Sequence, residues 1–114
     1  MHTVTIDWPN PDCSQNSNKH WRKMYTARKK QKADVALLCR HLPKCERKGF
    51  IPVAVTFYPP TEGRRDADNM LSCVKAAIDA IAKQIGVDDS RFWPMSQHLG
   101  EIRKPPEVNI TLEY

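Results

Sequence analysis

Residues 64–86 read RRDADNMLSCVKAAIDAIAKQIG, and this stretch decides the fold. Its large apolar side chains recur at intervals of three, four, three and four, which is the spacing of one face of an α-helix. These side chains are Leu71, Val74, Ile78, Ile81 and Ile85. Asp68 or Asn69 suits the N-cap, and Gly86 suits the residue that ends a helix. The sequence therefore predicts one helix from Asp68 or Asn69 to Ile85.

Strands are predicted before and after this helix in the sequence. Residues 51–58 are β-branched and aromatic, and Pro59 halts them. After the helix, residues 92–102 form a candidate strand that Pro94 interrupts. Residues 108–114 alternate Val, Ile, Leu and Tyr with polar side chains, which indicates a last strand.

The N-terminal part predicts one more strand and one more helix. Residues 2–7 alternate as a strand does, and residues 10–18 are rich in loop-forming Pro, Asp, Ser and Asn. Thr26 is expected to cap a helix that runs to about Leu42. The resulting order, β-α-β-α-β-β, predicts a single α/β (α+β) domain over residues 1–114, with two main helices packed against a small mixed β-sheet.

The composition limits the class of protein. A chain of 114 residues with 40% hydrophobic content has the size and the apolar content of one domain with one core. No apolar run approaches the ~20 residues that span a bilayer, and the polar start lacks a secretory signal. We therefore expect a soluble, cytoplasmic protein that does not enter a membrane. The cysteines include no CxxC pair, which favours reduced thiols over a zinc site or disulfides. They are Cys13, Cys39, Cys45 and Cys73.

Positive charge is concentrated before and inside the first predicted helix. The chain has a net charge of +5, and seven of its eighteen basic residues lie between Lys19 and Lys32. Such runs are usually solvated helix faces. Here Trp21 and Tyr25 interleave with the cations and supply stacking surfaces, which favours DNA contact. The predicted DNA-binding residues are Lys19, Arg22, Lys23, Arg28, Lys29 and Lys30, together with Arg64 and Arg65 farther along the chain.

Three aspartates form a candidate metal site. Asp66 and Asp68 precede the strongest helix in an extended or turning segment, where both can point at one cation, and Asp89 arrives from the loop after the helix. At ~4 Å separation and an effective dielectric of about 20, each pair of carboxylates repels by roughly 4 kcal/mol, so the cluster needs a compensating cation. Oxygen ligands suit Mg²⁺, with Mn²⁺ as the alternative.

The same acids also have a purely structural interpretation. Taken alone, Asp-x-Asp-Asn before a helix is more often a capping arrangement than a metal site. Asn69 could cap the helix, orient a carboxylate or contact phosphate, and capping is the default. The adjacent Arg64 and Arg65, together with Lys75 and Asp89, favour the metal site instead. Two further acids stay open at this stage. Asp79 suits an ordinary ion pair with Lys75 as well as a supporting role in the site, and Asp88 is better explained as a turn residue than as a ligand.

The stretch from Arg64 to Asn69, followed by Lys75, Asp79 and Asp88-Asp89, resembles the RusA family of Holliday-junction resolvases, which are small phage-derived endonucleases. The family signature is an RRDxDN stretch, a helix with a lysine and a later Asp-Asp pair. The Pro, Ser and Asn-rich loop ahead of a basic helix is also similar, so the resemblance covers the whole chain.

The resemblance implies a RusA-like fold and a Mg²⁺-dependent enzyme in a bacterial or phage-infected cell. This enzyme nicks four-way DNA junctions as a symmetric homodimer, in DNA recombination and repair. Asp66, Asp68 and Asp89 would be the catalytic acids, and Lys75 the catalytic lysine. The founding member of the family has its lysine four residues after the second acid, where this chain has Ser72. Seven residues in a continuous helix rotate about 700°, so Lys75 is expected on nearly the same face.

Two rival functions are kept open. One is a non-catalytic basic DNA-binding module whose acids hold a structural cation. The other is a metal-dependent nuclease that acts on RNA or on branched DNA other than four-way junctions. Cleavage by the wild type and by an Asp68→Asn variant separates the first rival from the enzyme, and comparison of junction, flap, duplex and RNA substrates separates the second.

Overall fold

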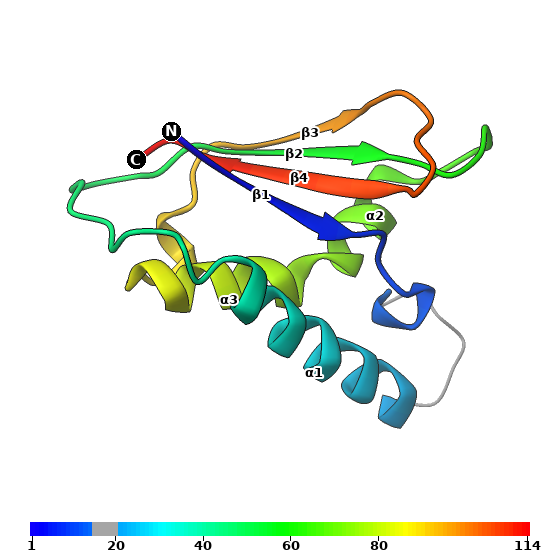
Figure 1. The fold of residues 1–114 in the computed structure, drawn as a ribbon, viewed down its shortest axis with the longest axis horizontal. Helices are drawn as coiled ribbons and strands as arrows, with labels where there is room; N and C mark the ends of the chain where they lie inside the picture. The colour runs from blue at the N-terminus through cyan, green and yellow to red at the C-terminus, as the bar shows by residue number, and fades with distance from the viewer. Residues whose placement is uncertain (15–20) are drawn as a thin grey trace.

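The computed structural model describes residues 1–14 and 21–114 and has an α+β architecture. A mixed four-stranded sheet lies on one side and the helices lie on the other (Figure 1). The main elements are β1 (His2–Asp7), α1 (Trp21–Leu38), β2 (Val53–Tyr58), α2 (Ala67–Cys73), α3 (Lys75–Ile85), β3 (Met95–Leu99) and β4 (Glu107–Leu112). Two short 3-10 turns, η1 (Pro11–Cys13) and η2 (Asp89–Arg91), complete the elements. The predicted fold class is confirmed.

The sheet has the strand order β1-β4-β2-β3. β4 pairs antiparallel with both β1 and β2, while β2 and β3 are parallel because α2 and α3 connect them. Both chain ends therefore lie together, and the Met1 amino group donates to the Tyr114 carbonyl at 3.2 Å. The predicted mixed sheet is confirmed, with β3 and β1 as its edges.

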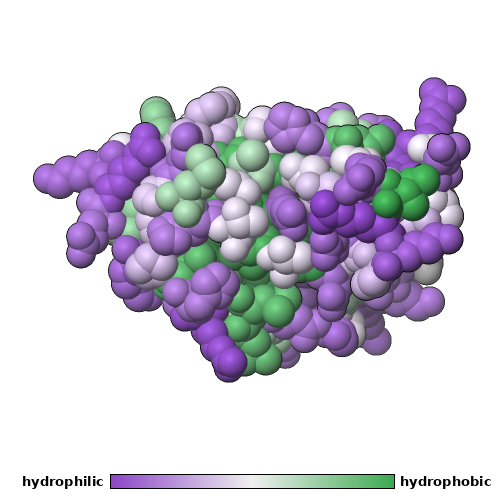
Figure 2. Space-filling view, turned by 45° about the horizontal axis from the view of Figure 1, so that its top comes forward, coloured by the Kyte–Doolittle hydropathy of each residue, from purple (hydrophilic) through white to green (hydrophobic). Residues whose placement is uncertain are grey.

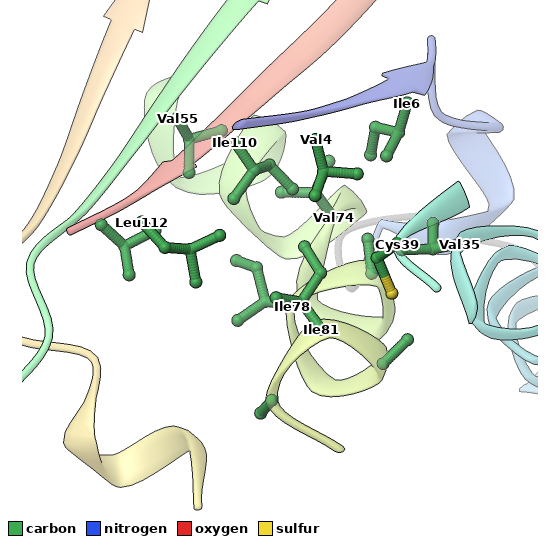
Figure 3. Close-up of a cluster of buried hydrophobic side chains, with 14 of the residues drawn as sticks. Val4, Ile6, Val35, Cys39, Val55, Val74, Ile78, Ile81, Ile110 and Leu112 are labelled. Carbon is green, nitrogen blue, oxygen red and sulfur yellow. The ribbon is translucent and has the colours of Figure 1, made fainter. Parts of the chain in front are cut away.

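Alternation along the strands sends one set of side chains into a single core. Val4, Val55, Ile110 and Leu112 from the sheet meet Ile81 of α3 and its neighbours, and all of them are essentially inaccessible (Figure 3). Burying apolar surface contributes about 25 cal/mol per Å², so this layer is the main source of stability.

Most residues of α3 are buried, because the helix packs against both the sheet and α1. Its buried residues are Ala76, Ala77, Ile78, Ala80, Ile81, Ala82 and Ile85. The alanines permit close approach of the neighbouring layers, and the isoleucines fill the space under the strands. α1 lies outside this layer, and Val35 is its one buried residue among those described. Most of the basic residues of α1 are therefore exposed.

The predicted single helix from Asp68 or Asn69 to Ile85 is wrong in two respects. It begins at Ala67 with Asp66 as N-cap, whose carboxylate accepts from the Asp68 N–H at 3.2 Å. It also breaks at Val74, where φ is −113° and ψ is 8°, and α3 starts at the next residue. The predicted end is confirmed, since Gly86 has φ 78° and its N–H donates to the Ala82 and Lys83 carbonyls.

Other boundaries also differ from those expected. α1 begins at Trp21, five residues before the predicted cap Thr26, and ends at Leu38 rather than Leu42. The strand predicted over residues 92–102 is confined to β3. β3 starts directly after Pro94, because proline has no N–H to donate to a sheet.

The surface is mixed in character. Figure 2, which brings the sheet side of Figure 1 forward, shows hydrophilic residues over most of this face and hydrophobic residues in separate areas. The outward side chains of β1 and β4 include Thr3 and Thr111, whose hydroxyls are 3.0 Å apart, and Thr5, which donates to Asn109 at 2.9 Å. Among the helices in residues 1–14 and 21–114, none has the length and the apolar character needed to cross a membrane.

Candidate functional site

A groove of about 360 Å³ brings together most of the acids identified in the sequence. We call it the acid groove. Its polar lining comes from Asp68 and Ser72 of α2, Lys75 and Asp79 of α3, and Asp89 of η2. Leu71, Ile78 and Met95 supply its apolar wall. Residues 21 positions apart in the chain thus share one site, because the chain turns back at Gly86.

Asp79 and Asp89 meet in this groove. Burial, followed by hydrogen bonding and charge repulsion with Asp89, raises the pKa of Asp79, while Lys32 and Lys75 act in the opposite direction. A carboxyl next to a second carboxylate loses its proton less readily than an isolated one, and a bound cation would relieve the repulsion between the two. Two roles were left open for Asp79, an ion pair with Lys75 and support of the site. Asp89 acts on the Asp79 carboxyl more strongly than Lys75 does, which favours the supporting role.

Asp66 has a different position from the other acids. It is not one of the described residues that line the acid groove, and its carboxylate caps α2. Asp88 caps η2, where hydrogen bonds from Ser90 lower its pKa, so the expected turn role of Asp88 is confirmed. Asn69 does not cap the helix as expected, because α2 begins at Ala67 with Asp66 as its N-cap. The Asn69 side-chain oxygen accepts a hydrogen bond from the buried Ser14 hydroxyl instead.

The donor chemistry of the acid groove fits a hard divalent cation, since Asp68, Asp79 and Asp89 offer carboxylate oxygens and no sulfur or imidazole. Within residues 1–14 and 21–114, however, no three His, Cys, Asp or Glu side chains are grouped closely enough to hold a metal ion. The metal role of Asp66, Asp68 and Asp89 therefore stays a prediction.

Lys75 reaches the acid groove by a route that helical periodicity did not predict. It is the first residue of α3, directly after the break at Val74, so it does not share a continuous helix with Asp68. In an unbroken helix the Ala77 N–H would donate to the Cys73 carbonyl. Here the Gln31 amide of α1 takes both places, because its oxygen accepts from Ala77 at 3.2 Å and its nitrogen donates to Cys73 at 2.8 Å.

A second groove, of about 490 Å³, continues from the acid groove along α1. We call it the α1 groove. The two grooves share Lys75 and Asp79 in their linings. The side chains that α1 contributes include Trp21, Tyr25, Arg28, Lys29 and Lys32, which fall on one helical face. Lys32 belongs to the basic segment for which DNA contact is predicted, and its i+7 spacing places it on the same helical face as Tyr25.

The remaining predicted DNA-binding residues are dispersed. Lys19 lies outside the described residues, and Arg22 and Lys23 are exposed on the first turn of α1. Lys30 lies on another side of α1, where it pairs with Asp34 at 2.6 Å. Their DNA contacts stay predictions.

Arg64 and Arg65 differ from each other. Arg64 is exposed beside the N-terminus of α2. Arg65 donates to the Thr61 carbonyl at 2.9 Å and its guanidinium lies 5.6 Å from the centre of the Trp8 ring. Arg65 therefore stabilises the loop that precedes α2, whatever it contacts besides.

The cysteines are all free thiols. Cys13, Cys39 and Cys73 are buried, and burial raises the pKa of each of these thiols. A raised pKa keeps a thiol protonated and unreactive near neutral pH. These side chains therefore act as small apolar residues of the interior.

Comparison with known proteins finds a relative of this chain. A protein of Xylella fastidiosa (strain Temecula1 / ATCC 700964), described as an uncharacterized protein, is 33% identical over 119 residues, which cover 98% of this chain and 76% of the relative. No protein-family model matches the chain.

Proposed function

We propose that this chain, which belongs to the same family as the Xylella fastidiosa protein, is a Mg²⁺-dependent, structure-specific endodeoxyribonuclease that resolves Holliday junctions. One observation carries the proposal. The acid groove, which is lined by Asp68, Lys75, Asp79 and Asp89, continues into the basic α1 groove. Acids that hold a hard cation beside cations that attract a polyanion are the pairing that phosphodiester cleavage needs.

In this proposal the charged groups of the acid groove, together with Asp66 at the N-terminus of α2, have separate tasks. Asp66, Asp68 and Asp89 would hold Mg²⁺, which supplies Lewis acidity at the scissile phosphate. The Lys75 ammonium would offset the negative charge that develops on the phosphate oxygens. Asp79 would attract the Lys75 ammonium and form a hydrogen bond with Asp89, because it faces both of them in the groove.

The proposed partner is branched DNA, and the proposed active form is a homodimer. A four-way junction has near-twofold symmetry, and its resolution needs two matched nicks, so a subunit with one site would act with a second copy. Recombination and repair are the processes in which such a reaction would serve.

The test is cleavage of a synthetic four-way junction by the wild type in Mg²⁺, by the wild type in EDTA and by Asp68→Asn in Mg²⁺. We expect paired, symmetric nicks in the first reaction alone, with junction binding retained by Asp68→Asn. If the wild type cleaves in neither Mg²⁺ nor Mn²⁺, the rival function of a non-catalytic DNA-binding module would be favoured. Equal cleavage of junction, flap, duplex and RNA would end the junction assignment.

A further inference from the structure

The α1 groove has a composition that phosphate binding alone does not explain. Trp21 and Tyr25 line it although 62% and 60% of their surfaces are exposed. They lie one helical turn apart, so both rings face the same hollow. Neither ring belongs to the hydrophobic core of the described residues. Large exposed aromatic rings in a positively charged groove are the surfaces on which unpaired bases stack.

Positively charged side chains lie next to both rings, where they can bind the phosphate of a nucleotide. The Lys29 ammonium lies 6.0 Å from the centre of the Tyr25 ring, and the Arg22 guanidinium lies 5.5 Å from that of Trp21. Lys32 lies farther along the same groove, close enough to Asp79 to act on its pKa. A base on the rings would therefore have its phosphate among ammonium groups.

The connection to the acid groove sets the position of this nucleotide along the strand. Lys75 and Asp79 line both grooves, so a strand that follows the α1 groove enters the acid groove directly. The α1 groove, at about 490 Å³, falls within the roughly 300–1,000 Å³ range of small-ligand sites and so has room for a single nucleotide. A base inside a duplex is covered on both faces by its neighbours and cannot stack there.

We propose that the α1 groove binds one unpaired DNA nucleotide next to the bond to be cut, with its base stacked on Trp21 or Tyr25 and its phosphate beside Lys29 and Lys32. Cleavage of the bond next to this nucleotide rests on the proposed nuclease function, whereas binding of the base does not. The substrate is then DNA whose strand is unstacked at the cleavage point, which a branch point provides and an intact duplex does not.

The test places the fluorescent base 2-aminopurine at the branch point of a four-way junction and measures its fluorescence and the Kd in EDTA. With the wild type we expect a fluorescence change on binding, which Trp21→Ala or Tyr25→Ala reduces while the junction Kd rises about 5- to 150-fold. Trp21→Phe should restore most of the change, because phenylalanine keeps a stacking surface. Phe50→Ala is the control, since Phe50 is 63% exposed but lines neither groove.

The exposed lysines Lys29 and Lys83 form a matched pair for the phosphate. Lys29 lines the α1 groove, whereas Lys83 lies in the last turn of α3 and lines neither groove. Lys29→Ala should make the slope of log affinity against log salt shallower by about 0.7–0.9, and Lys83→Ala should leave it unchanged. Equal changes for both variants would overturn the placement of the phosphate.

The outcomes separate the two proposals. Cleavage by the wild type, with unchanged 2-aminopurine signal and Kd in both aromatic variants, would overturn the base-binding site and leave the nuclease. Equal weakening of junction and duplex binding by Trp21→Ala would also overturn it. Loss of the signal in these variants, without cleavage by the wild type, would support the base-binding site and reject the nuclease.

Discussion

At the scale of single residues, Asp66 combines a structural contact with a proposed catalytic one. It caps α2, and asparagine caps a helix about as well as aspartate does. Asp66→Asn should therefore keep the stability of the wild type to within about 0.3–1 kcal/mol, the effect of a charge at a helix N-terminus. Asp66→Ala should cost about 0.5–2 kcal/mol.

Both substitutions should reduce Mg²⁺-dependent cleavage by more than about 10-fold if the carboxylate serves the metal. Urea unfolding and junction cleavage of the same two proteins provide the measurements. Full activity of Asp66→Asn beside an inactive Asp68→Asn would restrict Asp66 to capping.

Asp79 gives the fold a pH dependence of definite sign. Its pKa is raised above the ordinary value of 3.8, so between that value and the raised one the folded chain holds more protons than the unfolded chain. Stability therefore falls as the pH rises through this window, and the full cost is present above the raised pKa. We expect Asp79→Asn to raise the Tm at pH 7 in EDTA, and this gain should vanish below pH 3.8.

Asp34→Asn is the control for this prediction. Asp34 forms an exposed ion pair with Lys30, so its loss should lower the stability only slightly at neutral pH. A gain from Asp79→Asn that is equally large at pH 3 and pH 7 would contradict the ionic explanation.

At the scale of elements, the break between α2 and α3 depends on a side chain from α1. Gln31 satisfies the Cys73 carbonyl and the Ala77 N–H, which flank the turn that carries Lys75. Gln31→Leu would leave both backbone groups without their partner at a cost of about 1–3 kcal/mol each. Gln31→Glu should be intermediate, because an ionised carboxylate can accept from Ala77 but cannot donate to Cys73.

Junction cleavage should fall with Gln31→Leu at a temperature where the variant is folded, because Lys75 lies inside the turn that Gln31 holds. Gln84 offers the matched control. Its amide donates to the Arg40 and Leu42 carbonyls, so Gln84→Leu also removes a link between a glutamine and the backbone, but outside the acid groove. Equal loss of cleavage in both variants would show that general destabilisation is the cause.

At the scale of the whole molecule, the proposed function requires two copies of the site. We expect a solution mass of twice 13.1 kDa and conversion of a cruciform plasmid to linear DNA, because both nicks fall within one binding event. Mixed dimers of wild type and Asp68→Asn should produce nicked circles instead. Sedimentation equilibrium and gel analysis of the plasmid measure these outcomes, and an active monomer that linearises the plasmid would contradict the dimer.

Local patterns were sufficient for most of the elements. Alternation and helical spacing depend on the nearest neighbours in the chain, so β1, the end of α3 at Gly86 and the mixed α+β class followed from the sequence. The break at Val74 was not predicted, because the apolar spacing of three and four residues continues across it. Nothing local reveals that Gln31 occupies the gap.

The sequence by itself determined which chemistry is available: carboxylates near residues 66–68 and 88–89, a lysine between them and a basic helix with two aromatic rings. Only the tertiary structure decided which of these groups meet. It placed Asp79 against Asp89, assigned Asp66 to a helix cap and joined the α1 groove to the acid groove. The physical reason is that burial of the α3 isoleucines under the sheet sets the path of the backbone, and the polar groups take the positions that this path leaves them.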